Sequence, residues 1–213
     1  MSFDKSFRVD SVGAWLRLGF VLVLSVVVGV GMWSVVVILP TVQLDLGITR
    51  GQASLPYVAT MVGYGLGGAV FGRFSDRYGI HRTVVIGIVL MSLGYVSASF
   101  APNLGFLSLS QGLLIGVGTS TTFAPLIAHV SHWFERRKGA AVGIVASGQY
   151  LSGAIWPTVL ESALKDYGWQ HTYMLVGVVI LLMALPLSMV LSQRPSNVEG
   201  GVDAPAESLP SKL

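Results

Sequence analysis

The segment 72–82, GRFSDRYGIHR, gathers five ionisable side chains in a chain that has few of them: Arg73, Asp76, Arg77, His81 and Arg82. The stretches on either side of it are almost free of charge. The Asp76 carboxylate can accept hydrogen bonds from helix N-termini or pair with the arginines, and a guanidinium can also pair with a lipid phosphate. The cluster is therefore either a releasable ionic contact or a charge signal that only sets the orientation of the chain in a membrane.

Side chains suited to covalent or metal chemistry are scarce. The chain has no cysteine, which excludes disulfides and thiolate chemistry. His129 and His132 have only Glu135 nearby as a further ligand, which does not make a zinc site. We find no nucleophile beside a base and no clustered carboxylates within the apolar runs, as an intramembrane hydrolase would need. We expect no enzyme activity, no metal and no cofactor. The net charge of +3 comes without a basic stripe interleaved with aromatics, so we expect no nucleic-acid partner.

The composition predicts a membrane protein. Of the 213 residues, 53% are hydrophobic and 11% are charged, whereas about a quarter of the residues of a soluble protein are charged. Runs such as 18–39 are longer than the roughly 20 apolar residues that a helix needs to cross a bilayer. A signal peptide would have a shorter apolar core and a small-residue cleavage site after it, so we expect this first run to be retained.

The same criterion predicts six transmembrane helices and places the charged segment between two of them. Helices are expected because backbone groups in lipid need partners within their own segment. The predicted all-α bundle occupies residues 18–192, after a cytoplasmic N-terminus at 1–17 and before a disordered cytoplasmic tail at 193–213. The six predicted spans are 18–39, 53–72, 83–100, 104–130, 139–160 and 171–192.

Lysine and arginine lie mainly on one side of this predicted topology. Eleven of the 13 fall at the N-terminus, after spans two and four, and in the tail, and only Arg50 and Lys165 fall on the other side. By the positive-inside rule both termini are cytoplasmic, and we expect the plasma (inner) membrane.

A short internal similarity suggests a repeat. DRYGIHRT (76–83) precedes span three, and KDYGWQHT (165–172) precedes span six, with Tyr, Gly and Thr at matching positions. An odd number of spans separates the two copies, so they face opposite sides of the membrane. This spacing is typical of an inverted repeat of three helices plus three, as in many secondary transporters.

The segment GRFSDRYGIHR closely resembles the Gly-x-x-x-Asp-Arg-x-Gly-x-x-Arg signature between helices two and three of the major facilitator superfamily. Two further stretches, HWFERRKGAAVGIVASGQYLSGAIWP (132–157) and DYGWQHTYMLVG (166–177), are similar to the entries into helices five and six in its monocarboxylate and oxalate/formate branch. The resemblance covers residues 18–192.

This resemblance implies two six-helix bundles that rock about a central substrate site. It implies that the signature residues form a cytoplasmic latch against the second bundle, with Asp76 as the carboxylate and three arginines as its partners. The implied latch residues are Gly72, Arg73, Asp76, Arg77, Gly79 and Arg82.

The sequence departs from the family pattern in two ways. It contains six predicted spans, so the resemblance implies a second bundle in a further segment, a partner chain or a second copy. Many relatives also have an arginine in helix four, whereas this chain has Gln111 and Gly112 there. A proton relay built on that arginine is therefore not expected.

Polar side chains within the spans are candidates to face a substrate, because such groups are costly when they face lipid. The alternative is that they hydrogen-bond between helices and only stabilise packing. The candidate cavity residues are Trp33, Tyr57, Tyr64, Gln111, Thr119, Ser147 and Tyr150. None is charged, so an anionic substrate would need a counter-charge from the second bundle.

We interpret the chain as the N-terminal half of a major-facilitator transporter for a small organic anion such as a monocarboxylate. The alternative is a non-transporting adaptor or receptor built on the same bundle. The expected partners are the substrate, the lipid bilayer and a second six-helix bundle.

Overall fold

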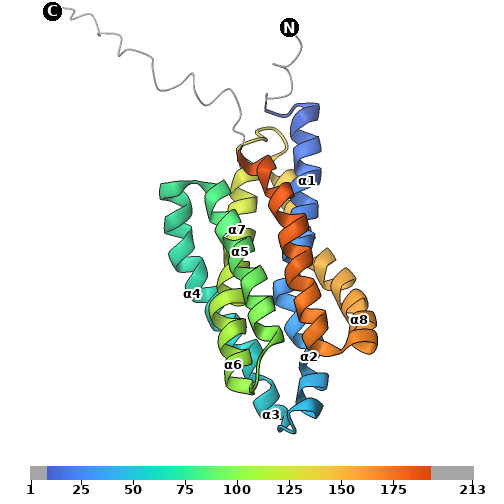
Figure 1. Ribbon diagram of the computed structural model, residues 1–213. Helices are drawn as coiled ribbons and strands as arrows, with labels where there is room; N and C mark the ends of the chain where they lie inside the picture. The colour runs from blue at the N-terminus through green and yellow to red at the C-terminus, as the bar shows by residue number, and fades with distance from the viewer. Residues whose placement is uncertain (1–8, 193–213) are drawn as a thin grey trace, which may run out of the picture.

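The computed structural model describes residues 9–192, and every regular element in that range is helical. The predicted N-terminal segment is therefore described only from residue 9, and the predicted tail lies outside the described residues. The elements are α1 (Val12–Val28), α2 (Val30–Asp45), α3 (Arg50–Ala53), α4 (Leu55–Tyr78), α5 (Ile80–Ser99), α6 (Leu104–Leu109), the π-helical η2 (Ser110–Gly116), α7 (Val117–Ser131), α8 (Lys138–Ser188) and the 3₁₀-helical η3 (Met189–Ser192) (Figure 1).

Local sequence explains several helix starts. The Ser11 hydroxyl accepts the backbone N–H of Ala14 at the start of α1, and the Asn103 side chain accepts that of Phe106 at the start of α6. At α3, Thr49 and Gln52 form a reciprocal capping box. These side chains satisfy backbone donors that a helix start leaves without a partner.

Five helical stretches among residues 9–192 are long and apolar enough to cross a membrane, against six predicted spans. They are 12–45, 50–78, 80–99, 104–131 and 138–192. The first four each correspond to one predicted span, and the third ends one residue before its predicted span does. The fifth contains both predicted spans 139–160 and 171–192, because the non-helical backbone inside α8 is confined to Gly168. Figure 1 shows that the chain reverses direction within α8, so this element has two arms lying in opposite directions.

Gly79 and Gly168, the two glycines of the internal similarity, have nearly the same backbone conformation. Gly79 has φ 91° and ψ 155°, and Gly168 has φ 74° and ψ 172°. L-residues with a side chain rarely adopt such positive φ values, which explains the glycines. Four residues later, the Thr83 hydroxyl donates to the Gly79 carbonyl at 3.0 Å, and the Thr172 hydroxyl donates to the Gly168 carbonyl at 2.7 Å. Both sites start a helix in the same way.

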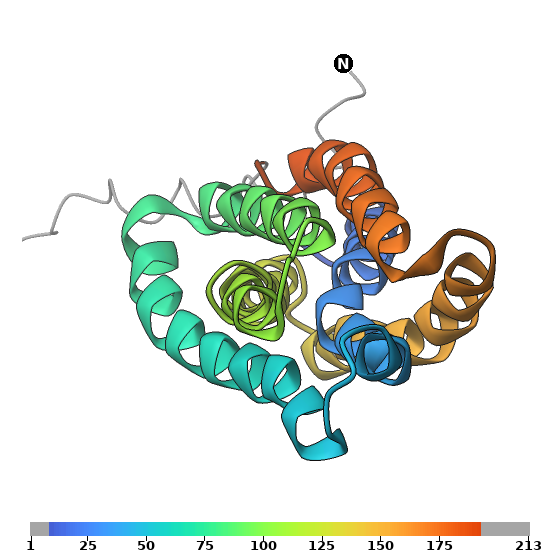
Figure 2. The same ribbon diagram turned by 60° about the horizontal axis from the view of Figure 1, so that its bottom comes forward.

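Glycines bring α4 very close to η2 and α7. A Cβ at Gly63 would overlap the Gly112 carbonyl group, and a Cβ at Gly67 would come within 2.5 Å of the Ser120 hydroxyl oxygen. Figure 2 shows α6 and α7 inside the arc that α4 and α5 form. Small residues allow such contact between membrane helices, where lipid supplies no hydrophobic force to press them together.

A chain of buried polar side chains crosses the centre of the bundle. Gln111 of η2 donates to the Tyr173 hydroxyl in the second arm of α8 at 2.5 Å, and it accepts from Thr60 of α4 at 3.3 Å. The Tyr173 ring packs edge-on against Tyr95 of α5, with centroids 5.1 Å apart. The Tyr95 hydroxyl lies 2.6 Å from that of Ser34 in α2. These contacts connect five elements that are distant in sequence.

We expect Gly63→Ala to lower the stability of the bundle by about 1–3 kcal/mol, because the added methyl would meet the backbone of Gly112. Gly65→Ala is the matched control, since a Cβ there would have no neighbour within 4 Å and alanine favours the helix. Thermal unfolding of both variants in one detergent measures the difference. Equal melting temperatures would show that α4 does not depend on this contact.

We expect Tyr173→Phe to destabilise the bundle by about 0.6–2 kcal/mol, because it leaves the buried Gln111 amide without its acceptor. Tyr150→Phe is the control, because the Tyr150 side chain is exposed and its hydroxyl has no hydrogen bond within residues 9–192. A double-mutant cycle with Gln111→Leu measures the coupling between Gln111 and Tyr173. A coupling energy of zero would contradict the network.

Candidate functional site

The charged segment is mostly helical and is not a loop. Helix α4 continues to Tyr78, Gly79 is the single residue between helices, and α5 begins at Ile80. The predicted connection of about ten residues between spans 53–72 and 83–100 is therefore shorter than expected. The reason is that the positive φ of Gly79 turns the chain in one step. Arg73, Asp76 and Arg77 consequently occupy defined positions on the last turns of α4.

Asp76 is exposed, and within residues 9–192 it has neither a hydrogen bond nor an ion pair. Arg73 instead donates to the Ala69 carbonyl at 3.3 Å, and the Arg77 guanidinium lies over the Tyr78 ring, 5.5 Å from its centroid. Arg82 is exposed at the start of α5. The structure therefore does not pair Asp76 with these arginines. The carboxylate is accessible to a group from outside this bundle.

Gly72 and Gly79 occupy different environments. Gly79 uses the backbone freedom of glycine, whereas a Cβ at Gly72 would have no neighbour within 4 Å. Gly72 thus makes no close packing contact in the described part of the chain. The predicted role of both glycines in a latch stays a prediction.

Asp10 connects the N-terminal end of the bundle to the connection between α7 and α8. Its carboxylate accepts the backbone N–H of Arg136 at 3.0 Å, and its own N–H donates to the Trp133 carbonyl at 3.1 Å. The Arg17 guanidinium lies over the Trp133 ring, 4.3 Å from its centroid. In Figure 1 this connection lies at the same end of the molecule as the start of α1 and the end of α4, which gathers most of the described arginines at one end.

The candidate cavity residues separate into buried and exposed groups. Gln111 and Thr119 are fully buried, and the Thr119 hydroxyl donates to the Ile115 carbonyl of its own helix at 2.7 Å. Trp33 is half-buried and donates to the Gln149 carbonyl at 3.2 Å. These three residues have partners in the helix packing. Their role in binding a substrate stays a prediction.

The other candidates lie nearer the surface. Tyr57 is 38% exposed and Tyr150 is 77% exposed, whereas Tyr64 is half-buried. Ser147 is exposed and donates to the Ile144 carbonyl at 2.7 Å. Tyr57 and Tyr64 share one side of α4, while Ser147 and Tyr150 share the first arm of α8. No hydrogen bond within residues 9–192 joins the two groups.

Two polar side chains in the helix packing, Asp45 and Ser152, were not singled out from the sequence. The Asp45 carboxylate, at the end of α2, accepts from the Trp169 indole at 2.9 Å and from the Gln170 amide at 3.3 Å, which holds the turn of α8 in place. The sequence signal that could have indicated this contact is the position of the Asp45 carboxylate shortly after a long apolar run. Ser152, whose hydroxyl lies buried beside Gly29 without a hydrogen bond, had no distinguishing signal in the sequence.

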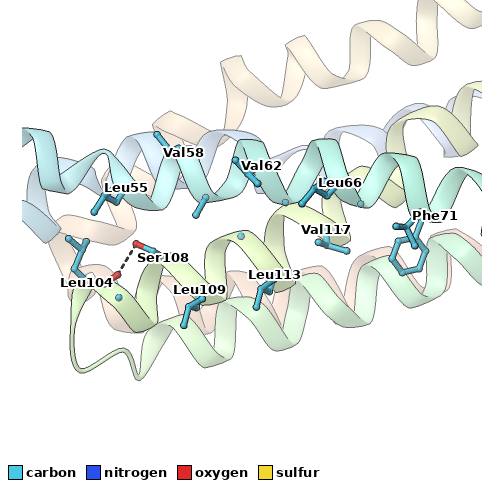
Figure 3. Close-up of a pocket in the computed structure, with 16 residues that line it drawn as sticks. Leu55, Val58, Val62, Leu66, Phe71, Leu104, Ser108, Leu109, Leu113 and Val117 are labelled. Carbon is cyan, nitrogen blue, oxygen red and sulfur yellow. Dashed lines mark hydrogen bonds between the residues drawn. The ribbon is translucent and has the colours of Figure 1, made fainter.

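An apolar groove of about 610 Å³ lies between α4 and the α6–η2 segment (Figure 3). Helix α4 contributes residues at helical spacing, and α6, η2 and the start of α7 form the other wall. Ser108 is the only hydroxyl-bearing residue in the lining, and its hydroxyl donates to the Leu104 carbonyl at 2.8 Å. The groove therefore offers little for a polar substrate to bind.

Comparisons with known proteins agree with the sequence signature. The model of the Major Facilitator Superfamily matches residues 21–212. The "MFS-type transporter pytF" of Aspergillus terreus is 33% identical over 138 residues, covering 64% of this chain and 47% of the relative. Human "Monocarboxylate transporter 11" is 37% identical over 130 residues, covering 59% of this chain and 28% of the relative. The chain thus covers less than half the length of either relative.

The fold also resembles a solved transporter structure. A crystal structure of a mutant of the peptide transporter POT in complex with alafosfalin aligns with a TM-score of 0.69 and 20% identity, covering 86% of this chain and 39% of that one. The superfamily resemblance predicted from the charged segment is confirmed, and the matched family and relatives are transporters and not enzymes. The chain is an integral membrane protein, and it belongs to the Major Facilitator Superfamily of transporters.

Proposed function

We propose that this chain, through the bundle at residues 18–192, is one half of a secondary transporter that moves a small organic anion by alternating access. The names of relatives such as human "Monocarboxylate transporter 11" support a monocarboxylate as the substrate class. The six predicted spans contain no lysine, arginine or carboxylate, so the counter-charge for the anion would come from a second bundle.

A second bundle is also supported by the surface of this one. Tyr57 and Tyr150 are exposed within predicted spans 53–72 and 139–160, and a Cβ at Gly68 or Gly72 would have no neighbour within 4 Å. Small residues on an uncovered helix face suit close contact with another helix. A further segment, a partner chain or a second copy could supply it.

The proposed half-transporter has six crossings arranged as three plus three. The shared conformation of Gly79 and Gly168, each followed by a threonine that bonds back to the glycine carbonyl, supports this repeat. The reversal of α8 at Gly168 supports counting its arms as two crossings. Both termini would then lie on the cytoplasmic side. The membrane that we propose is the plasma membrane.

The observation that best supports transport by alternating access is the carboxylate of Asp76, which is unpaired within residues 9–192. A carboxylate at the end of α4 without a partner in its own bundle is suited to a contact that forms and breaks with the second bundle. An accessible ion pair contributes only about 0–1 kcal/mol, which is small enough for such a contact to open repeatedly. We propose that Gly72, Gly79 and the nearby arginines shape this latch, and that Trp33, Tyr64 and Tyr150 belong to the cavity wall.

We expect Asp76→Asn to reduce transport at least tenfold without changing the amount of folded protein. The test places this chain in a chimera with the C-terminal bundle of human "Monocarboxylate transporter 11" and measures uptake of labelled monocarboxylates into vesicles. Glu161→Gln is the control, since Glu161 is an exposed carboxylate far from the latch. Binding of a monocarboxylate with no uptake by the unmodified chimera would favour the adaptor or receptor alternative.

We expect cysteines at positions 75 and 137 to be labelled from one side of the membrane, and a cysteine at 165 from the other. The natural chain has no cysteine, so single Ser75→Cys, Arg137→Cys and Lys165→Cys variants need no further change. Labelling of sealed vesicles with a membrane-impermeant maleimide, before and after permeabilisation, reports the side. Position 165 reacting from the same side as 137 would rule out two crossings in α8.

A further inference from the structure

The apolar groove between α4 and the α6–η2 segment faces outward from the bundle. Its most exposed wall residues are Leu66, Val70, Leu109 and Leu113, each more than 60% exposed. Gly63 and Gly112, whose backbones approach closely, also line the groove. Figure 3 shows Leu66 on the α4 wall, and Leu109 and Leu113 on the opposite wall. In a membrane-embedded protein this surface is suited to a hydrocarbon chain.

Two arginines continue the groove-lining stripe of α4. The lining residues Val62, Leu66 and Val70 recur every four residues, and an α-helix of about 3.6 residues per turn places Arg73 and Arg77 on the same side one and two turns further on. Both arginines are exposed. Arg73 uses one N–H for the Ala69 carbonyl, which leaves its other donors available.

The groove lining on α4 begins at Leu55, and its part nearest the arginines, from Val62 onward, fits one leaflet of a bilayer. At about 1.5 Å per residue, the helix rises about 17 Å from Val62 to Arg73. Half of a hydrocarbon core of about 30 Å is about 15 Å. An acyl chain that starts beside Arg73 would therefore end near Val62.

The groove is also separate from the surface proposed to meet the second bundle. Tyr57 and Tyr64 lie about half a turn around α4 from Val62 and Leu66, on the opposite side of the helix. Asp76 lies between the two sides, next to the arginines in sequence but off the stripe. The groove can therefore stay open to lipid in a complete transporter. Arg73 and Arg77 also belong to the proposed latch, and they would bind a lipid headgroup while that latch is open.

We propose that this groove binds one acyl chain of an anionic phospholipid, whose headgroup phosphate pairs with Arg73 and Arg77. The groove offers an acyl chain an apolar surface without an unsatisfied hydroxyl, because the Ser108 hydroxyl is already hydrogen-bonded within its helix. The guanidiniums supply charge-assisted, bidentate hydrogen bonds to phosphate. A second copy of the chain is a poorer occupant, since a symmetric contact along this stripe would bring two pairs of arginines together. The site needs only membrane insertion and does not depend on transport.

Native mass spectrometry of the full chain tests the charge part of the site. We expect phosphatidylglycerol to stay bound where phosphatidylcholine with the same acyl chains is lost. The double variant Arg73→Gln and Arg77→Gln should weaken phosphatidylglycerol binding about tenfold or more, and it should leave phosphatidylcholine unchanged. Arg82→Gln is the matched control, because Arg82 is exposed at the same end but lies on α5. An equal loss in the control and the double variant would overturn the assigned headgroup site.

Filling the groove tests the acyl-chain part. Val62→Trp should remove the retained phosphatidylglycerol, whereas Val36→Trp should keep it, because Val36 is similarly exposed on α2 away from the groove. Circular dichroism and size-exclusion profiles check that both variants fold. Retention of the lipid by folded Val62→Trp contradicts the proposal. So does efficient disulfide dimerisation of a Leu66→Cys variant in phosphatidylglycerol vesicles, because it would place a second copy in the groove.

Discussion

The bundle depends on the contact between α4 and η2, where Gly63 meets the backbone of Gly112. Apolar side chains gain little by leaving lipid for another helix, so membrane helices associate through close packing and polar contacts. Without Cβ atoms at this crossing, α4 lies near enough for Thr60 to reach Gln111. The crossing also sets the direction in which α4 presents its remaining sides. One side carries Tyr57 and Tyr64, and the opposite side forms the wall of the groove.

Gln111 illustrates how a polar residue in a membrane helix can serve the fold. It lies in the π-helical segment Ser110–Gly116, fully buried, with partners on α4 and the second arm of α8. π-helical turns often occur at functional sites, and here the turn places one amide between two neighbouring helices. The network it joins contains tyrosine and serine hydroxyls in place of charges. Such a network avoids the high cost of an ionised group at this depth.

Much of the fold was predictable because a helix that crosses a membrane needs a long apolar run, and such runs are visible in the sequence. The run at 104–130 corresponds to α6, η2 and α7, which together span 104–131. The π-helical turn within it was not predictable, because no local residue pattern distinguishes it from an α-helix. The single helical element across spans five and six was also missed, because its break needs only Gly168.

The candidate site was predictable in its residue types and less so in its geometry. The sequence singled out Asp76 and its neighbouring arginines as possible partners, but α4 continues through Arg73, Asp76 and Arg77, and the structure shows no ion pair between them. Polar residues such as Gln111 and Tyr150 were grouped together because each lies in an apolar run. Tertiary packing alone determines that one is buried and the other exposed.

The turns at Gly79 and Gly168 each reverse or redirect the chain with one non-helical residue. Such tight connections leave almost no irregular backbone for a protease to bind and cleave or for an antibody to recognise. A tag or reporter domain inserted at either point would have to unwind a helix end. The longer connection at 132–137 offers more irregular chain, although Asp10 holds its backbone in place. Tags and reporter domains on this chain are therefore best attached outside the bundle.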